Sequence, residues 1–393
     1  MTTGPVRVVL LGATGSIGES ALRVARALPG RITIAGISGR NPNRLLELGR
    51  GFPEAVVCSG SEETASRLSA SLGRLVHHGA EGLETLATHP GADLVLVAIV
   101  GTAGLKPALA ALASGKDLAV ASKEILVMAG EEVMAAAARS GRRVLPVDSE
   151  HNAIFQCLEG KDPATVKRLI LTCSGGPFRK AGPGDLASVT PEQALRHPTW
   201  SMGRKISVDS ATLFNKGLEM IEARWLFGIP MDRIDVVIHP QSIVHSMVEF
   251  VDGSILAQLG STDMALPIQY ALTYPDRVAG PCAPLDLATL GRLEFDPPDG
   301  TLSRAGSGPS CRNRGRDAPS RPQRGQRGRR RCVSGRPSPL PWNLGTGRLG
   351  HGFRALCGAP DAGSTHRGRP HREGCGAGLI SIDASPLLCR AHS

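Results

Sequence analysis

The sequence predicts an α/β protein, in which a doubly wound parallel sheet over residues 1–147 is followed by an α+β domain over residues 148–299. In the first region, short β-branched runs alternate with helix-like stretches, which is typical of a parallel sheet wound by helices. A glycine-rich turn directly follows the first of these runs. The second region has longer helical stretches and, at Asp252 and Gly253, the dipeptide that favours a β-hairpin.

The expected elements follow from the apolar pattern. In the first region we expect strands at 7–11, 32–37, 55–58, 94–100, 117–121 and 143–147, and helices at 19–28, 43–49, 62–72 and 105–114. In the second region we expect a helix over 210–226 and strands over 166–173, 236–239, 246–251 and 254–259.

Composition excludes several classes of protein. The chain has 393 residues with 41% hydrophobic content, enough for two or three domains with their own cores. Its longest apolar run, residues 94–100, is far shorter than the roughly 20 residues that a membrane-spanning helix needs. The N-terminus leads straight into the first expected strand without a leader pattern, so we expect a cytoplasmic protein with no membrane partner. Cys58, Cys157, Cys173 and Cys282 form no C-x-x-C motif, which favours reduced thiols.

The last 93 residues differ sharply from the rest. Residues 1–300 carry 28 Lys and Arg against 31 Asp and Glu, whereas residues 301–393 carry 17 Arg, no Lys and 4 acidic residues. Arg, Gly, Pro and Ser make up 52 of these 93 residues. Such a stretch buries too little apolar surface to offset the entropy of ordering it, so we expect residues 300–393 to be a disordered basic tail.

The glycine-rich turn spells Gly-Ala-Thr-Gly-Ser-Ile-Gly at 12–18, between an expected strand and an expected helix. In that context it predicts a Rossmann-like dinucleotide site, because glycines let the backbone approach a diphosphate at the helix N-terminus. The alternative is a turn that binds no ligand. After the second strand, Arg40 with Ser38 and Asn41 replaces the acidic residue that NAD enzymes use, which favours NADP(H), although Arg40 could also be a solvated surface charge.

Three acidic residues form a candidate metal site. Asp148 and Glu150 are two apart at the end of an expected strand, so we expect both on one face with no obvious cation beside them. Glu219 lies one turn after Asn215 on an expected helix. A purely oxygen donor set favours Mg²⁺ or Mn²⁺ over zinc. The alternative is a pair of solvent-facing acids beside a helix cap.

Polar residues nearby suit a phosphorylated substrate. Ser174 precedes two glycines after a strand, and Ser210 leads to Asn215 and Lys216. Cys173 lies next to this site, and one thiol beside a Gly-Gly turn is more often inert than nucleophilic. Three histidines are candidates for the site, with a satisfied structural role as the alternative for each: His151, His197 and His245.

Taken together, these motifs resemble 1-deoxy-D-xylulose 5-phosphate reductoisomerase. The resemblance covers residues 6 to about 299. It is carried by the motif at 12–18, Pro-Val-Asp-Ser-Glu-His-Asn at 146–152, Ser-Gly-Gly-Pro-Phe-Arg at 174–179, the block at 197–219 and His-Pro-Gln-Ser at 239–242.

The resemblance implies an NADPH- and divalent-metal-dependent enzyme of isoprenoid biosynthesis that converts 1-deoxy-D-xylulose 5-phosphate, a small phosphorylated sugar, to 2-C-methyl-D-erythritol 4-phosphate. It implies a homodimer and a catalytic second domain. The metal ligands it implies are Asp148, Glu150 and Glu219. The implied substrate contacts are Lys123, Ser149, Glu150, Ser174, His197, Trp200, Met202, Ser210, Asn215 and Lys216. The implied cofactor contacts are Gly12, Thr14, Gly15, Ser16, Ile17, Gly39, Arg40, Asn41, Glu124 and Gly203.

The family's chemistry and its moving loop also carry over as expectations. A metal chelated by two substrate oxygens polarises the carbonyl during the rearrangement, and NADPH then delivers hydride to the resulting aldehyde. A loop from about residue 174 to 204, with Trp200 and Met202 as its apolar part, is expected to close and exclude water. The chain departs from the family by having Ser122 in place of an asparagine and Cys173 in place of a small residue. We expect the first to weaken a local hydrogen-bond network without abolishing activity, and the second to fit with little strain.

The tail departs from the family most. The family continues with a helical C-terminal domain, whereas this chain continues with Arg-, Gly- and Pro-rich sequence. If permitted codons for residues 319–336 are read one nucleotide later, they can spell PAVLNAANEVAVDAFLAG, which resembles the family's C-terminal segment. The same offset at 301–306 permits another family-like piece, so we infer a change of reading frame near residues 297–301, in the gene or in its sequencing record.

Two other functions are compatible with the sequence. A simple NADP-dependent aldehyde dehydrogenase would need a nucleophilic cysteine, for which Cys173 is the candidate, and no metal. A nucleic-acid-binding protein would use the arginine-rich tail. Only 3% of the residues are aromatic, and Cys, Trp and Leu are scattered through the tail without a pattern, so nucleic acid is not the expected partner.

Overall fold

The computed structural model describes residues 4–181, 189–196, 200 and 203–298. Contacts within the chain divide it into the units Met1–Ser310 and Cys311–Ser393, and every described residue belongs to the first unit. The expected disordered tail lies outside the described residues, as do His197 and Met202.

The first sheet is parallel throughout and has the strand order β4-β3-β2-β1-β5-β6-β7. This doubly wound order, spreading both ways from β1, confirms the predicted α/β fold. The expected strand at 94–100 ends at Val97, and Val100 is exposed in the following loop. The strands are β1 (Val6–Leu11), β2 (Ile32–Gly39), β3 (Val56–Ser59), β4 (Val76–His78), β5 (Leu94–Val97), β6 (Asp117–Val120) and β7 (Val144–Pro146).

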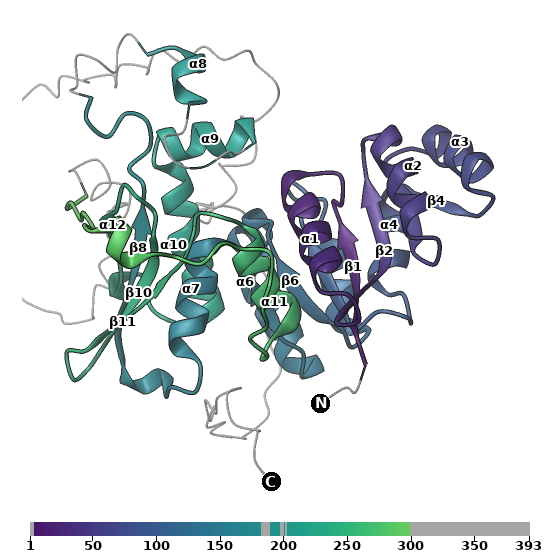
Figure 1. Ribbon diagram of the computed structural model, residues 1–393. Coiled ribbons are helices and arrows are strands. Elements are labelled where there is room, and N and C mark those ends of the chain that lie inside the picture. Colours follow the sequence, from purple (N-terminus) through teal and green to yellow (C-terminus); the bar gives the residue numbers. More distant parts are fainter. Residues whose placement is uncertain (1–3, 182–188, 197–199, 201–202, 299–393) are drawn as a thin grey trace, which may run out of the picture. The chain divides into compact units, whose positions relative to one another are not determined.

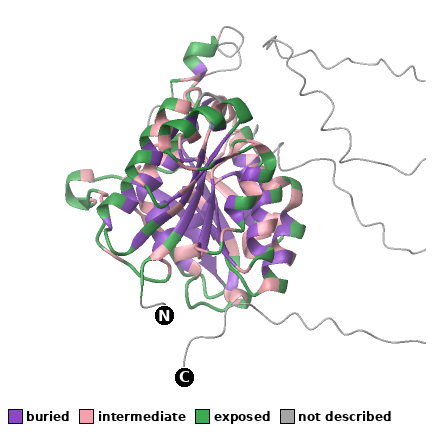
Figure 2. Ribbon diagram, turned by 90° about the vertical axis from the view of Figure 1, so that its right-hand side faces the viewer, coloured by how far each residue is buried: buried purple, intermediate pink, exposed green. Residues whose placement is uncertain are grey.

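Helices cover both faces of this sheet, so two apolar cores form. On β1, Val8 and Leu10 face one core with α1, α2 and α3, whereas Val9 and Leu11 face the other with α4, α5 and α6. Figure 2 shows the buried strands between helices whose outer faces are exposed. The helices are α1 (Ser16–Ala27), α2 (Pro42–Gly51), α3 (Glu62–Leu72), α4 (Gly79–Ala87), α5 (Leu105–Ala113) and α6 (Lys123–Ser140).

A second sheet follows, with the order β11-β10-β8-β9, in which only the β8 and β9 pair is parallel. The expected hairpin turn lies between β10 and β11, where Gly253 has a φ of 86°. The expected helix at 210–226 is broken into two at Leu213, whose φ is 58°. The strands are β8 (Val166–Cys173), β9 (Ile234–Ile238), β10 (Val244–Phe250) and β11 (Ile255–Leu259), and the helices are α7 (Ser149–Leu158), α8 (Pro191–Ala194), α9 (Arg204–Ala211), α10 (Phe214–Phe227), α11 (Ala265–Thr273) and α12 (Leu287–Leu290).

Helix α11 returns from the second sheet to the first (Figure 1). Its residues Ala265 and Ile268 join the core that contains Leu22 of α1. Arg23 of α1 also forms an ion pair with Asp263, just before α11. The loop before α11 is thereby held close to the glycine-rich turn. In the described part of the chain, no helix is long and apolar enough to cross a membrane.

Candidate functional site

The glycine-rich turn joins β1 to α1 and brings two backbone segments into close contact. Gly12 has a φ of 100°, and a Cβ there would lie 2.5 Å from the carbonyl oxygen of Ala98. A Cβ on Gly18 would lie 2.4 Å from the carbonyl oxygen of Gly12. Both positions therefore require glycine, and Gly15 begins α1 with its first turn facing a cavity. This geometry is suited to a diphosphate.

The groups predicted to meet a 2′-phosphate lie at the end of β2. The Ser38 hydroxyl is buried and accepts a hydrogen bond from the Gly12 amide at 3.1 Å, so it holds the turn in place. The Asn41 side chain caps α2 by accepting from the Arg44 amide at 3.1 Å. Arg40 is exposed, and Gly39 packs against Thr14. Of this set, Arg40 is the cation available to a phosphate.

Asp148, Glu150 and Glu219 come together as predicted, but the local reason given for the first two is wrong. Strand β7 ends at Pro146, so Asp148 and Glu150 do not alternate along a strand. Asp148 is instead the N-cap of α7, and Glu150 lies in the first turn of that helix. Glu219 comes from α10 and is 1% exposed. One carboxylate oxygen from each residue lies within 4.8 Å of the others.

Two lysines lie beside this triad, although no cation was expected beside Asp148 and Glu150. Lys123 Nζ is 2.7 Å from Asp148 Oδ2 and 3.2 Å from Glu219 Oε1. Lys216 Nζ is 2.8 Å from Glu150 Oε1 and also pairs with Glu219 Oε2. Lys123 begins α6 and Lys216 lies in the first turn of α10, so neither is a sequence neighbour of Asp148 and Glu150. The pattern within 146–152 could not reveal them.

The charges in the triad are set by burial and by these lysines. Burial opposes ionisation of Asp148 and Glu150, but the ammonium groups of Lys123 and Lys216 lower the pKa of each carboxyl below its usual value. Burial, reinforced by the nearby Glu150 charge, raises the pKa of Glu219 to about 7. The oxygen donors, their spacing and their burial fit a Mg²⁺ or Mn²⁺ ion, for which carboxylates are the preferred ligands.

The triad and the N-terminal turn of α1 line one cavity of about 510 Å³. The cavity joins the carboxyl end of the first sheet to the second sheet, where open α/β folds bind their ligands. It also holds residues that no motif singled out, Val100, Thr262 and Met264, because they come from loops without a sequence signature. The predicted residues that line it are Gly15, Ser16, Ile17, Lys123, Glu124, Asp148, Ser149, Glu150, Ser174, Trp200, Gly203, Ser210, Asn215, Lys216 and Glu219.

The predicted phosphate site lies on one side of this cavity. Gly175 and Gly176 have φ angles of 80° and 69°, and the Gly176 amide donates to Ser174 Oγ at 3.2 Å. A Cβ on Gly176 would lie 2.9 Å from the carbonyl oxygen of Ser210, so the turn packs against the end of α9. Lys123 Nζ donates to Asn215 Oδ1 at 2.7 Å, which links this side of the cavity to the triad.

The two described candidate histidines differ in position. His151 is fully buried outside the cavity lining, and its Nε2 lies 2.8 Å from the main-chain oxygen of Glu219. His245 lines the cavity, and its ring centroid lies 6.1 Å from that of Trp200. Burial lowers the pKa of His245, which favours a neutral imidazole.

The two departures from the family pattern are both accommodated. Ser122 is buried and its hydroxyl donates to the carbonyl oxygen of Ile99 at 2.6 Å. Cys173 ends β8 and packs beside Ile238. Burial raises the pKa of the Cys173 thiol, which disfavours the thiolate that a nucleophile needs.

Comparisons with known proteins agree along the described chain. Residues 8–130 match the family model for 1-deoxy-D-xylulose 5-phosphate reductoisomerase, and residues 144–227 match the model for the C-terminal domain of that enzyme. Residues 259–303 match the DXP reductoisomerase C-terminal domain. The reductoisomerase of Symbiobacterium thermophilum is 54% identical over 300 residues, covering 74% of this chain and 77% of the relative. That of Anaeromyxobacter dehalogenans is 54% identical over 296 residues, covering 75% of this chain and 76% of the relative.

Solved structures give the same result. DOX-P reductoisomerase in complex with NADPH, fosmidomycin and magnesium is 44% identical with a TM-score of 0.73, covering 77% of this chain and 78% of that one. The Zymomonas mobilis enzyme in complex with NADPH is 42% identical with a TM-score of 0.71, covering 77% and 80% of the two chains. This chain therefore belongs to the 1-deoxy-D-xylulose 5-phosphate reductoisomerase family.

Proposed function

We propose that the cavity carries out the family's reaction, the NADPH- and divalent-metal-dependent conversion of 1-deoxy-D-xylulose 5-phosphate to 2-C-methyl-D-erythritol 4-phosphate. The observation that carries this proposal is the convergence of Asp148, Glu150 and Glu219 in the same cavity as the glycine-rich turn. A relative at 44% identity was solved with NADPH and magnesium, which supports the same cofactors here.

The cofactor would lie along the first sheet. The N-terminal turn of α1 offers the amides of Ser16 and Ile17 and the positive end of the helix dipole to the diphosphate, whereas the Gly15 amide donates to the Gly12 carbonyl oxygen at 3.1 Å. Arg40 supplies a cation at the end of β2, where a 2′-phosphate would lie. Because Gly15, Ser16 and Ile17 line the same cavity as the triad, a cofactor held there would supply hydride to a substrate in that cavity.

The substrate phosphate would lie on the opposite side. The Ser174 and Ser210 hydroxyls, the Asn215 amide and the Lys216 ammonium provide donors for its oxygens. Lys216 would reach the phosphate by giving up one of its three contacts, which are to Glu150, Glu219 and the carbonyl oxygen of Thr172. Holding one end of the sugar phosphate in this way orients the other end toward the triad.

The triad would bind the cation, which when bound polarises the substrate carbonyl and stabilises negative charge on its oxygens. The Lys123 ammonium contacts Asp148, Glu219 and Asn215 and would donate to a substrate oxygen beside Asp148 by exchanging one of these contacts. The Ser149 hydroxyl donates to Glu150 Oε2 at 2.5 Å and so fixes the carboxylate's orientation. Trp200, on the segment expected to close, contributes an apolar wall that excludes water.

We also propose that the protein is a homodimer. Strand β11 forms an edge of the second sheet, and its Ile255 and Leu256 side chains are 50% and 40% exposed. An exposed apolar edge strand is a template for pairing with another chain, and a second copy would cover it. The free thiols of Cys58, Cys157, Cys173 and Cys282 favour the reducing cytoplasm as the compartment.

The test is NADPH oxidation by the full-length protein with 1-deoxy-D-xylulose 5-phosphate, with and without Mg²⁺ or Mn²⁺. We expect metal-dependent turnover, which Glu150→Gln reduces by roughly 10²-fold or more and Cys173→Ala leaves within a few-fold. Turnover in the presence of a chelator, or activity that requires Cys173 and tolerates Glu150→Gln, would instead support the aldehyde dehydrogenase alternative.

A further inference from the structure

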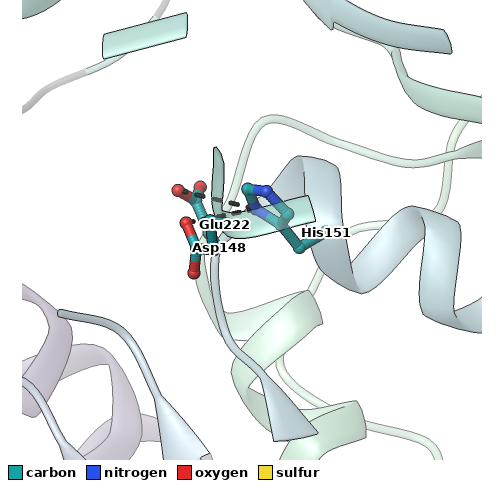
Figure 3. A group of neighbouring side chains, drawn as sticks. All are labelled: Asp148, His151 and Glu222. Carbon is teal, nitrogen blue, oxygen red and sulfur yellow. Dashed lines mark ion pairs between the residues drawn. The ribbon is translucent and has the colours of Figure 1, made fainter. Parts of the chain in front are cut away.

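A second cluster of ionisable side chains shares Asp148 with the triad, and its other two members lie outside the cavity lining. It consists of Asp148, His151 and Glu222, and one ligand-type atom from each lies within 4.8 Å of the others (Figure 3). His151 and Glu222 are 0% and 1% exposed, and neither lines the cavity. A buried carboxylate without access to substrate costs free energy unless other groups stabilise it, so its position calls for an explanation.

The cluster connects the two helices that carry the triad. His151 lies one turn after Asp148 on α7, and Glu222 lies one turn after Glu219 on α10. The His151 imidazole faces α10 with both nitrogens. Its Nε2 is 2.8 Å from the main-chain oxygen of Glu219, and its Nδ1 is 3.5 Å from Glu222 Oε2. The same Nδ1 is 3.9 Å from Asp148 Oδ2, a carboxylate of the triad.

We propose that His151 and Glu222 act together as positioning residues that set the separation between Asp148 and Glu219, and so tune the affinity of the triad for its divalent cation. The proposal rests on the proposed function, because it assumes that the triad binds a cation. The contact from His151 Nε2 to the main-chain oxygen of Glu219 fixes the position of α10 relative to α7. Glu222 Oε2 and His151 Nδ1 are both buried and neither forms a hydrogen bond, so their 3.5 Å ion-pair contact is what would hold the ring at the angle that makes this contact.

This role differs from a simple cross-link between helices. A cross-link would affect stability and leave the affinity of the folded site unchanged. A positioning pair changes the affinity because a ligand displaced by a fraction of an ångström no longer meets the ion at its preferred distance. Groups of this kind typically alter metal affinity 10- to 100-fold.

The test is a titration of the full-length protein with Mn²⁺, followed by electron paramagnetic resonance of the free ion. Glu222→Gln keeps the side-chain volume and removes the charge, and His151→Gln retains a donor but loses the ring nitrogen that faces Glu222. We expect each variant to raise the Mn²⁺ dissociation constant roughly 10- to 100-fold. Because the two residues act as a unit, the Mn²⁺ dissociation constant of the double variant should be no higher than that of the single variant with the higher value.

Glu249→Gln is the matched control. Like Glu222, Glu249 is a buried carboxylate, but it lies on β10 of the second sheet and outside both clusters. It is paired with Lys167 at 2.6 Å and with Arg168. Its replacement should leave the Mn²⁺ dissociation constant unchanged. If Glu222→Gln does not fold, Glu222→Asp keeps the charge on a shorter stem and should weaken Mn²⁺ binding while remaining folded.

An unchanged Mn²⁺ affinity in folded Glu222 variants would overturn the proposal, as would strictly additive effects of the two substitutions. Steady-state kinetics supply a second readout. At saturating Mn²⁺ the variants should recover most of the wild-type kcat, whereas the Mn²⁺ concentration for half-maximal rate stays raised. If wild-type protein binds Mn²⁺ without turning over the sugar phosphate, the proposed reaction fails while the Mn²⁺ titration still decides the role of this pair.

Discussion

At the scale of single residues, the site depends on buried charges that partly balance. Three carboxylates and the two ammonium groups of Lys123 and Lys216 share a largely buried space. If all five groups are ionised, one negative charge remains, and a divalent cation is attracted to the three carboxylates together. This balance also explains why Glu219, the most buried of the three, is the carboxylate whose pKa is raised.

The buried Glu222 predicts a specific dependence of stability on pH. Burial, opposed by His151, raises the pKa of Glu222 from 4.5 to about 7. The folded state therefore keeps a proton that the unfolded state releases, so the stabilisation is fully present below the unfolded pKa and is lost as pH rises through about 7. The Glu222→Gln variant has no titratable group at this position, so its stability does not fall with pH for this reason.

Denaturant unfolding in the presence of a chelator measures the effect. The free energy of unfolding of the wild type relative to Glu222→Gln should fall as pH rises from the unfolded pKa of 4.5 to about 7. The contribution of Glu219 has the same sign, and because Glu219 and Glu222 interact, the part of it that depends on Glu222 adds to the difference with that sign. A difference that stays constant or rises over this range would contradict the prediction.

At the scale of elements, the sequence predicts the long-patterned segments well and the short or polar ones poorly. The strands from β1 to β3 and from β8 to β11 are confirmed because each is a distinct apolar or alternating run. Strand β4 has three residues, too few to show a pattern. Helix α6 begins with Lys123 and Glu124 and is kinked at Ala129, so its apolar spacing is irregular.

The same distinction applies to the site. The triad was predictable because each acid belongs to a dense motif in the sequence. The reason that Asp148 and Glu150 lie close together was not predictable. Two acidic residues with this spacing can lie at the end of a strand or at the start of a helix, and the sequence does not distinguish the two. Lys123 was assigned to the substrate through the family resemblance, and its ion pair with Asp148 appears only in three dimensions.

The turn between β1 and α1 predicts a strong effect of one methyl group. In Gly18→Ala the new Cβ would meet the main chain of Gly12 and Ala13 at about 2.4 Å and 2.5 Å. Backbone cannot yield as a flexible side chain does, so we expect a loss of stability of roughly 1–3 kcal/mol and weaker NADPH binding. Thermal unfolding and fluorescence titration with NADPH measure the two effects.

Gly51→Ala is the control for this change. Gly51 is the last residue of α2, which packs on the same face of the first sheet as α1. A Cβ at Gly51 would meet nothing within 4 Å. We expect unchanged or slightly raised stability and unchanged NADPH affinity, because alanine restricts the unfolded chain more than glycine does. Equal effects of the two substitutions would show that the close approach at Gly18 is unimportant.

The exposed edge strand predicts how the subunits associate. Lysines in place of both Ile255 and Leu256 would put charge on β11 at positions that are half-exposed in the single chain. If this edge is the dimer contact, sedimentation velocity should show a dimer for the wild type and a monomer for the double variant, with an unchanged far-ultraviolet circular dichroism spectrum. A wild-type monomer, or a double variant that remains dimeric, would move the interface elsewhere.

At the scale of the whole molecule, similarity to the family stops where the composition changes. The last family match ends at residue 303, and the relatives align over 74–75% of this chain and 76–77% of their own length. About a quarter of each of these relatives lies outside the aligned segment. Apolar side chains near the end of the described region are exposed, among them Leu287 and Phe295, at 58% and 45%. A helical domain in the original frame would be placed to cover such surface.

If the reading frame changes near residues 297–301, as we infer, two different proteins follow from nearly the same gene. Resequencing across codons 295–305 should reveal one nucleotide gained or lost, and the intact mass of the natural protein should differ from 41.1 kDa. If the protein as written is made, restoring the frame should raise its melting temperature by roughly 2–4 °C for each kcal/mol of apolar burial regained, and should reduce the binding of a hydrophobic dye. Because the triad lies wholly before the change, both forms should bind Mn²⁺, and they should differ mainly in stability. An unchanged reading frame together with the mass of the written sequence would show that the arginine-rich tail belongs to the protein.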